Sequence, residues 1–498
     1  MMDDRRQSHS SVVPMNSPNK APERAAEARE GRDLAKGNSP EHNAFRTQGR
    51  VDAPSALERV REVAKRDRTQ RFTTLLHHVY DLERLRAAYF ALKRNAAAGV
   101  DGETWQSYGE QLEANLQDLA RRLQRGAYRA KPVRRAFIPK TDGRQRPLGV
   151  PALEDKIVQR AVVEVLNAVY EPEFLGFSYG FRPGRSPHRA LDALSVGLLA
   201  KKVNWVLDAD IRAFFDTLDH GWLMKFVEHR VADRRILRLI QKWLNAGVLE
   251  DGQRIVSEVG TVQGGSISPL LANLYLHYVF DLWVQRWRRT HAHGEVIVVR
   301  FADDFVLGFQ HRDDAERFLV ALRERFAQFG LALHPDKTRL LEFGRYAASD
   351  RQRRGDARPA TFNFLGFTHI CGKTRQGKFT VLRHTMRQRW QTKLKAVATA
   401  LRQRLHLPIP DVGAYLRAVV RGHFQYYGVP MNTSALQAFR QAIVRLWRWA
   451  LGRRSQTAHV TWTRMRRLVA RWLPPVRVCH PYPLVRFGVM TQGKSRMR

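Results

Sequence analysis

The chain has 498 residues, 44% of them hydrophobic, which is enough to bury a sizeable core and too long for one ordinary domain. Its 85 lysines and arginines against 47 acidic residues give a formal net charge of +38. A protein this basic repels itself unless an anion neutralises it, so the composition favours a nucleic-acid partner over the alternative, a ribosomal-type or generally adhesive cationic protein.

The two cysteines, Cys371 and Cys479, belong to no Cys-x-x-Cys pair. This spacing argues against a zinc ribbon and a disulfide framework, so we expect no disulfides and a reducing environment. No apolar run is long enough to cross a bilayer, and the polar N-terminus lacks the apolar core of a secretory signal. We therefore expect a cytoplasmic protein without a membrane segment.

The N-terminal part of the chain divides into a polar tail and a helical extension. Residues 1–55 are rich in Ser, Pro, Asn, Gly and charge, which predicts a disordered basic and polar tail. Residues 56–130 predict the helical extension, with helices over 56–93 and 103–126 separated by two glycines within 95–102. The apolar residues that recur at helical spacing in the first helix are Leu75, Leu76, Val79, Leu82, Leu85 and Tyr89.

Residues 131–370 predict a mixed sheet domain. A strand is expected over 133–139, and the clearest later strands are 203–209, 296–301 and 304–309. Helical stretches alternate with these strands, which indicates an α+β fold with helices packed on one side of the sheet.

The remainder of the chain is basic and helical. From residue 371 onward there are 26 lysines and arginines and one acid, Asp411, so this part carries +25 of the net charge. Residues 371–475 predict a helical RNA-binding module, because guanidinium groups bind phosphate and aromatic rings stack on unpaired bases. Residues 476–498 predict a short basic tail. We assign Trp390 and Trp447 to the core of the helical bundle.

Two acid-bearing segments lie far apart in the sequence. An apolar strand ends in Asp208 and Asp210, and the adjacent acids Asp303 and Asp304 lie between two short β-forming runs. An isolated Asp-Asp pair is most often a solvated turn, but a second acid-ending strand favours a shared site. Clustered carboxylates repel one another unless a cation lies between them, and hard oxygen ligands favour magnesium.

Several segments resemble motifs of the reverse transcriptases encoded by group II introns. Phe-Ala-Asp-Asp at 301–304 looks like their Tyr-Ala-Asp-Asp box, the strand ending at Asp210 like their first catalytic block, and residues 261–276 like their Gln-Gly block. The resemblance runs from about residue 85 to about residue 475. It departs from the family pattern at Phe301, where a tyrosine hydroxyl is lost, and at Val262, where proline is common.

The resemblance implies a metal-binding catalytic triad of Asp210, Asp303 and Asp304, with two Mg²⁺ ions as cofactors and deoxynucleoside triphosphates (dNTPs) as substrates. Asp208 lies two residues before Asp210, hence on the same strand face, and is a candidate for supporting the site. Phe215 matches the position of the family's steric gate, where a ring would collide with a ribose 2′-hydroxyl. Plain core packing is the alternative for Phe215.

Further nucleotide-binding residues are implied at three places. Lys140 and Arg146 match residues of the fingers that contact the triphosphate, although basic residues also suit a surface hairpin. Gln263 and Gly264 match a loop that lies against the incoming nucleotide and template, where glycine permits close backbone approach. Lys337 matches a lysine near the leaving group, where it would donate a proton.

Three segments resemble blocks that hold nucleic-acid strands. Residues 364–366, which are Phe364, Leu365 and Gly366, are similar to the block that grips the primer end. Residues 92–102 are similar to an N-terminal block that helps hold template RNA. Residues 421–429 are similar to the maturase-specific region, and the RNA-binding candidates there are Arg421, Tyr426 and Tyr427.

The fold implied by the resemblance is a right-hand polymerase. Its fingers would begin within 56–130, fingers and palm with an antiparallel sheet would occupy 131–370, and an α-helical thumb/maturase domain would occupy 371–475. The implied reaction is RNA-directed DNA synthesis, combined with binding of the parent group II intron RNA to assist splicing and intron mobility. The implied partners are intron and template RNA and a DNA target or primer, and a homodimer is left open.

The resemblance is to the bacterial type without an endonuclease. Many relatives carry a C-terminal nuclease with paired cysteines and histidines, which Cys371 and Cys479 cannot form. We therefore expect no endonuclease and a DNA primer supplied from elsewhere, for example a replication fork. Two rival functions are an RNA chaperone with a decayed polymerase, disfavoured by the intact acids, and a domesticated enzyme of phage defence or a retron-like system, disfavoured by the maturase-like residues 415–430.

Overall fold

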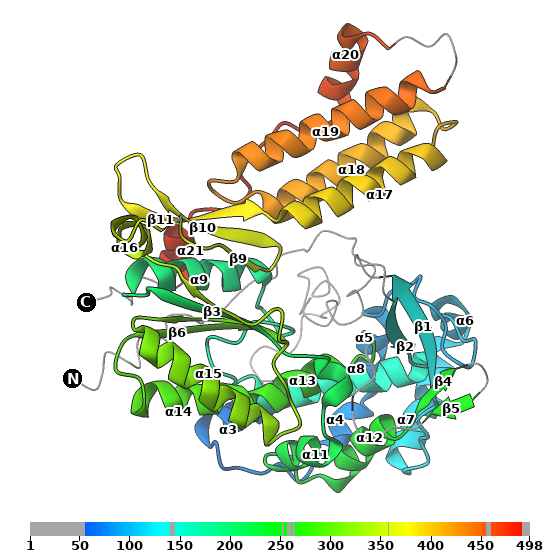
Figure 1. Cartoon of the computed structure of the whole chain (residues 1–498). Coiled ribbons are helices and arrows are strands. Elements are labelled where there is room, and N and C mark those ends of the chain that lie inside the picture. Colours follow the sequence, from blue (N-terminus) through cyan, green and yellow to red (C-terminus); the bar gives the residue numbers. More distant parts are fainter. Residues whose placement is uncertain are drawn as a thin grey trace.

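A computed structural model describes residues 55–139, 145–250, 253–255, 260, 264–356, 358–454 and 460–490. The tail expected over 1–55 lies outside the described residues except for Ser55, whose side chain accepts a hydrogen bond from the Glu58 amide and caps the first helix. No helix in the described ranges is long and apolar enough to cross a membrane. Figure 1 shows a bundle of long helices that extends away from the sheet-containing parts of the chain.

The N-terminal extension is built from short helices. The expected helix over 56–93 is divided into three, because the Asp67 carboxylate binds the amides of Thr69 and Gln70 and ends the first helix. The carboxylate of Asp233 then binds the amides of Leu75 and Leu76 and starts the second. The five helices are α3 (Ala56–Arg66), α4 (Leu76–Val79), α5 (Leu82–Phe90), α6 (Trp105–Glu110) and α7 (Leu112–Gln124).

A four-stranded hairpin sheet follows the extension. Its strand order is β2-β1-β4-β5, and β1 pairs antiparallel with β2 and parallel with β4. The strand expected over 133–139 is confirmed as β1. The bounds are β1 (Val133–Pro139), β2 (Gln145–Val150), β4 (Val248–Glu250) and β5 (Gln253–Ile255).

Helix α8 (Leu153–Tyr170) connects this hairpin sheet to the rest of the protein. Fourteen of its 18 residues are buried, including the polar Asp155, Lys156 and Gln159, so the helix lies in the middle of the core. Around it and the central sheet lie α10 (Phe214–Thr217), α11 (His220–Glu228), α12 (Arg234–Leu244), α13 (Ser268–Leu276), the π-helix η3 (His277–Asp281) and α14 (Leu282–Thr290).

The central sheet has four antiparallel strands in the order β6-β7-β3-β8. The three strands expected from the sequence are confirmed to within two residues at either end. The bounds are β3 (Trp205–Asp210), β6 (Val296–Phe301), β7 (Asp304–Phe309) and β8 (Arg339–Glu342).

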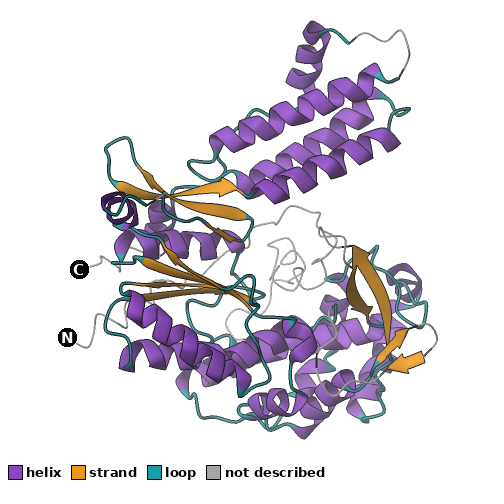
Figure 2. Cartoon of the chain, viewed as in Figure 1, coloured by secondary structure: helices purple, strands orange, loops and turns teal. Residues whose placement is uncertain are grey.

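Helices cover both faces of the central sheet, so the expectation of helices on one side was wrong (Figure 2). Val206 packs in a cluster with Leu191 and Leu194 of α9 (Pro187–Ala200). Its neighbour Leu207 packs in a second, larger cluster with Phe318 and Leu322 of α15 (Arg312–Ala327). Side chains alternate between the faces of a strand, and because both faces are apolar the strands read as continuous apolar runs.

A three-stranded sheet and a helical bundle complete the fold. The sheet order is β11-β10-β9, and it follows the short helix α16 (Ala347–Arg353). Trp447, fully buried, lies in the core of the bundle, as expected, and Trp390 packs against the same core. The bounds are β9 (Phe362–Phe364), β10 (Phe367–Lys373), β11 (Phe379–Thr385), α17 (Arg387–Gln403), α18 (Ile409–Tyr427), α19 (Thr433–Gly452) and α20 (Trp462–Trp472).

The C-terminal segment returns from the bundle to the central sheet. Residues 476–498 were expected to form only a tail, but they contain helix α21 (Pro483–Met490), which packs on α9. The buried carboxylate of Asp192 on α9 binds Arg486 at 3.1 Å and Arg383 of β11 at 2.9 Å. One acid thus joins three elements that are distant in the sequence.

Candidate active site

The expected acidic residues meet at one end of the central sheet. Asp210, the last residue of β3, is the register partner of Asp304, the first residue of β7. Opposite residues of antiparallel strands have Cβ atoms about 4.5–5.5 Å apart. Asp303 lies in the two-residue turn that joins β6 to β7. Strand pairing therefore brings together acids that are widely separated in the sequence.

The carboxylates lie on the sheet face that also packs against α9. Side chains two residues apart on a strand point to the same side, so Asp208 and Asp210 lie on the side of Val206. Asp304 lies on the side of Val306 for the same reason. Val206 and Val306 belong to the same apolar cluster. The face thus changes from apolar to acidic towards the turn.

The turn that carries Asp303 has a constrained backbone. Ala302 adopts a φ of 57°, in the left-handed region that side chains with a Cβ rarely occupy. Gly180 lies directly against this residue, because a Cβ built on Gly180 would lie 2.2 Å from the Ala302 nitrogen. Only glycine at position 180 lets the turn occupy this place.

Two basic side chains neutralise part of the acidic face. The Lys337 ammonium donates a short hydrogen bond to a carboxylate oxygen of Asp210. The Arg339 guanidinium donates to Asp208 at 3.1 Å. Burial raises the pKa of Asp208 to about 6, although the bond from Arg339 opposes the rise. Lys337 and Arg339 therefore hold two of the carboxylates in place from one side.

Asp304 bears most of the electrostatic repulsion. Its pKa is raised well above that of an ordinary aspartate, first because protein atoms displace water around it and then because Asp303, Asp210 and Asp208 are negatively charged. Solvent nevertheless reaches Asp304, which is an exposed residue by its accessible surface. Asp304 is therefore accessible to solvent in a region crowded with negative charge, and a cation would relieve the repulsion.

The acidic groups fit magnesium in their chemistry, since all are hard carboxylate oxygens. Within the described ranges, however, no three carboxylate, imidazole or thiol groups converge closely enough to form a complete metal site. In this structure the Asp210 carboxylate is paired with the Lys337 ammonium.

Phe215 lies close to the acids in the chain, on helix α10. Ala213, with a φ of 47°, turns the backbone sharply before this helix. Phe214 is buried in the core, whereas Phe215 is half-buried at the edge of the same cluster. The two rings meet edge to face with centroids 5.6 Å apart. Phe214 thus supplies the core packing and leaves part of Phe215 accessible.

The expected nucleotide-binding residues are described only in part. Lys140 and Gln263 lie outside the described residues, as does the side chain of Arg146. The backbone of Arg146 pairs with Ile138 in the β1–β2 hairpin. Gly264 has a φ of 118°, which a residue with a side chain rarely adopts, and it leads into α13.

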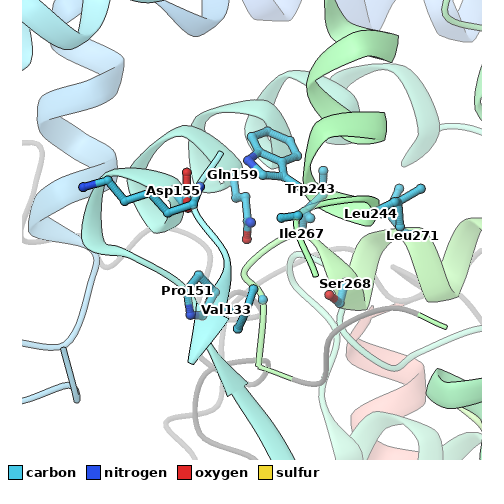
Figure 3. A pocket seen from close by; sticks show the side chains of 12 residues that line it. Val133, Pro151, Asp155, Gln159, Trp243, Leu244, Ile267, Ser268 and Leu271 are labelled. Carbon is cyan, nitrogen blue, oxygen red and sulfur yellow. The ribbon is translucent and has the colours of Figure 1, made fainter. Parts of the chain in front are cut away.

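A small cavity lies beside this glycine segment (Figure 3). The Gln159 amide points into the cavity, and its oxygen has no hydrogen-bond partner among the described residues. Asp155 in the wall accepts bonds from the Tyr128 hydroxyl and, at 3.1 Å, from the Lys131 amide, and burial raises its pKa to about 6. The cavity lies where β1, α8, α12 and α13 meet, and the remaining wall includes Val133, Pro151, Trp243, Gly265, Ile267 and Ser268.

The segment expected to grip a primer forms the turn between β9 and β10. Phe364 is buried, and the next two residues, Leu365 and Gly366, have φ values of 49° and 80°. The Tyr426 hydroxyl donates to the Leu365 carbonyl at 2.9 Å. A Cβ on Gly366 would lie 3.1 Å from the Tyr427 hydroxyl oxygen. The end of helix α18 therefore supports this turn.

The three expected RNA-binding residues differ in their surroundings. Tyr426 and Tyr427 pack on Phe367 with ring centroids 5.8 Å and 5.2 Å away, so both rings already have partners inside the protein. An RNA contact by either tyrosine stays a prediction. Arg421 is exposed on α18. It belongs to a larger set of exposed arginines on the bundle helices, which includes Arg387, Arg389, Arg402, Arg417, Arg445, Arg453, Arg464, Arg466, Arg467 and Arg471.

Three residues that the sequence did not single out contact the acidic site. Gly180 and Arg339 have the contacts described above, which depend on packing between distant segments. Arg300 is fully buried and donates to the Ala302 carbonyl at 2.9 Å. The sequence did mark Arg300, because it is a charged residue inside an apolar strand, and such a residue is buried only when it is paired.

The two cysteines, Cys371 and Cys479, are free thiols in the structure.

The comparison with protein families gives one match, to the family described as reverse transcriptase (RNA-dependent DNA polymerase). The matched residues, 138–369, include the four aspartates, Phe215, Lys337 and the β9–β10 turn. The match therefore covers the acidic site and most of the supporting sheet.

Curated relatives match less than half of the chain. The protein YkfC of Escherichia coli (strain K12) is 38% identical over 237 residues, which cover 42% of this chain and 62% of YkfC. The group II intron-encoded protein LtrA of Lactococcus lactis subsp. cremoris is 36% identical over 222 residues, 44% of this chain and 37% of LtrA. The mitochondrial nuclear intron maturase 1 of Arabidopsis thaliana is 27% identical over 114 residues, 23% of this chain and 16% of that protein. The matched region thus spans less than two thirds of each relative.

Proposed function

We propose that this chain, which is similar to reverse transcriptases over residues 138–369, is a group II intron-encoded reverse transcriptase/maturase that copies RNA into DNA and assists the splicing and mobility of its parent intron. The observation that carries the polymerase part is the register pairing of Asp210 with Asp304, with Asp303 in the adjoining turn. A nucleotidyl-transfer site would use neighbouring carboxylates to hold metal ions, and the closeness of these acids on paired strands and their connecting turn supports the proposal.

The proposed catalytic groups are Asp210, Asp303 and Asp304. When bound by these residues, two Mg²⁺ ions would stabilise the charge on the attacking 3′-hydroxyl and on the departing pyrophosphate. Lys337, whose ammonium binds Asp210, would donate a proton to the departing pyrophosphate. Asp208, bound to Arg339, would add negative charge behind Asp210 without ligating the metal.

The proposed dNTP site lies between the acids and the hairpin sheet. Phe215 is half-buried beside the core, so its free edge would exclude a ribose 2′-hydroxyl. Lys140, together with Arg146 of β2, would bind the triphosphate. Gln263 and Gly264 would lie against the base and the template. The support for these four is their place in the matched family region, residues 138–369.

The proposed architecture is a right hand. The hairpin sheet would be the fingers, which begin within 56–130, and the central sheet would be the palm, with both within 131–370. The helices of residues 371–475 would be the thumb. The β9–β10 turn at residues 364–366 would hold the primer end, and its support by Tyr426 would tie the primer position to the thumb.

The proposed RNA surface is the exposed arginine set on the bundle helices, including Arg421. From residue 371 onward the sequence contains one acidic residue, Asp411, so the positive charge of these arginines is almost unopposed. Arginines bind phosphate oxygens and stack on bases, so such a surface suits a folded RNA. In splicing, the protein would stabilise the folded intron, and the RNA would perform the chemistry.

Primer extension on poly(rA) annealed to oligo(dT) tests the polymerase proposal. The wild-type protein should extend the primer with dTTP and Mg²⁺, and Asp303→Ala should not. Extension by Asp303→Ala at the wild-type rate would remove these acids from the proposed mechanism. Absence of extension by the wild-type protein, with RNA binding retained, would favour an RNA chaperone instead.

Splicing of the flanking transcript at low magnesium tests the maturase proposal separately. The protein should raise the splicing rate, and unchanged splicing would remove this role while leaving the polymerase proposal intact. The sequence around the gene distinguishes a mobile-intron protein from a domesticated enzyme. Sequence that folds into catalytic intron RNA would flank the reading frame only if the protein belongs to a mobile intron.

A further inference from the structure

We infer that the buried pair Arg300–Asp281 is a positioning device that holds the Asp303 turn in its metal-binding place. The inference rests on the proposed polymerase function and adds to it residues that would never touch substrate or metal. The side chain of Arg300 connects the turn to η3, to α13 and to the segment around Ser178.

Arg300 is completely buried on β6, three residues before Asp303. Its guanidinium donates to the Ala302 carbonyl in the turn at 2.9 Å. The guanidinium also donates to the Asn273 side-chain oxygen on α13 at 3.0 Å and to the Ser178 hydroxyl oxygen at 2.7 Å. A rigid, planar guanidinium with donors in a fixed fork sets the position of each acceptor.

Asp281 accepts two bonds from Arg300, at 2.7 Å from Nε and 2.6 Å from Nη2. This two-bond geometry fixes the orientation of the guanidinium as well as its charge. Asp281 is itself fully buried and is the last residue of the π-helix η3, an irregularity found often at functional sites. The π turn and the ion pair together lock the arginine against the turn.

The same residues fix the segment on the other side of the turn. The Arg300 backbone amide donates to the Phe177 carbonyl, and its carbonyl accepts from Tyr179, both at 2.8 Å. Asn273 also donates to the Gly180 carbonyl at 2.6 Å. Gly180 is the residue that lies against Ala302. The turn is therefore held between the Arg300 guanidinium and the Gly180 backbone.

A buried ion pair is weak evidence for stability, because apolar residues of similar volume often stabilise a core equally well. The pair explains something else, namely how Ala302 remains at a φ of 57°. A residue in a sparsely populated conformation persists only where its surroundings determine it. The bond to the Ala302 carbonyl supplies that constraint, and the constraint sets the direction of the Asp303 side chain.

Arg300→Lys tests this inference, because lysine keeps the charge and loses the planar fork. Outer groups that orient metal ligands typically change metal affinity or activity by about 10–100-fold when substituted. We expect the Mg²⁺ concentration for half-maximal extension to rise by about tenfold and kcat to fall by about 10–100-fold. The KM for dTTP and the affinity for template RNA should stay within about twofold, because neither contact passes through Arg300.

Two measurements separate positioning from a purely structural role. Mn²⁺ binding, followed by electron paramagnetic resonance on the full chain, should weaken in Arg300→Lys by the same factor as the Mg²⁺ requirement. Arg230→Lys is the matched control, since Arg230 is also fully buried but binds the Asp67 and Gln70 carbonyls in the N-terminal extension. It should lower the melting temperature and leave the metal requirement unchanged.

The outcomes are distinguishable from failure of the proposed function. If the wild-type protein makes no DNA, the proposed function fails, and Mn²⁺ binding still tests the inference. If the wild-type protein makes DNA and Arg300→Lys is folded with unchanged Mn²⁺ affinity and kcat, the inference is overturned. If Arg300→Lys does not fold, Ser178→Ala replaces it, because this substitution removes one acceptor of Arg300. A weakening of Mn²⁺ binding in Ser178→Ala, smaller than that expected for Arg300→Lys, supports positioning. Unchanged Mn²⁺ binding in Ser178→Ala overturns the inference.

Discussion

Gly180→Ala is expected to move the Asp303 turn by about 1 Å and lower kcat by about 100-fold. The added Cβ would lie 2.2 Å from the Ala302 nitrogen and 2.9 Å from both the Ala302 Cα and the Phe301 carbonyl carbon. All three are backbone atoms, so no side chain can rotate away. Ordinary contact begins at 3.4 Å, so the turn must retreat by the difference. A 100-fold loss corresponds to about 2.7 kcal/mol of transition-state stabilisation.

The assay is single-turnover primer extension at saturating dTTP, together with thermal unfolding. Gly344→Ala is the control, because its Cβ would lie 1.9 Å from the Val203 carbonyl oxygen, near the end of β3 remote from Asp210. Both variants should lose stability, but only Gly180→Ala should lose the chemical step in the folded fraction. Equal losses of kcat in the two folded variants, or full activity in Gly180→Ala, would refute the reasoning.

Three other predictions concern the sugar gate, the leaving group and acid stability. Phe215→Ala should raise incorporation of ribonucleotides relative to deoxyribonucleotides, measured as the ratio of kcat/KM values for UTP and dTTP; an unchanged ratio would assign the ring to packing alone. Lys337→Met should lower kcat by about 100-fold, as loss of a general acid does, without weakening RNA binding, and full extension rates would exclude a proton-donating role. His423 stacks on Phe439 with centroids 3.6 Å apart, and burial lowers its pKa to about 3. The unfolded chain takes up a proton below pH 6.5 while the folded chain does not, so this histidine should lower the free energy of unfolding by about 2 kcal/mol at pH 5. His423→Leu should remove that part of the pH dependence in urea unfolding, and identical slopes would contradict it.

Local patterns in the sequence predicted the elements of the central sheet well. The strands over 203–209, 296–301 and 304–309 were expected from β-forming apolar runs, and each is present. These runs report local propensity and burial, which depend on neighbouring residues in the chain. The acid pair at the hairpin tip was predictable for the same reason, since turn and strands are adjacent in sequence.

Features that depend on distant contacts were not predictable. The break after Arg66 depends partly on Asp233, which caps the next helix from more than 150 positions away. Covering of both sheet faces depends on where α9 packs. Helix α21 is joined to α9 by the Arg486–Asp192 pair, whose partners lie far apart in the sequence. No local pattern marks such pairs, because either partner alone resembles an ordinary charged residue.

The supporting groups of the site follow the same rule. Asp210, Asp303 and Asp304 were recognisable from residue types and motif spacing. Gly180 and Arg339 contact the site only because the fold brings distant segments together. No motif around either residue in the sequence marks that contact. A prediction from sequence therefore identifies the reacting groups more readily than the groups that hold them in position.

The most direct measurement is Asp210→Asn, assayed in parallel for extension of an RNA-templated primer and for binding of the same RNA. The side chain keeps its size and loses its charge, and Asp210 lies on a well-paired strand. DNA synthesis should fall below detection while the dissociation constant for RNA changes by less than about threefold, since phosphate contacts dominate affinity. Retention of synthesis, or equal loss of synthesis and RNA binding, would contradict an acidic polymerase site at the end of this sheet.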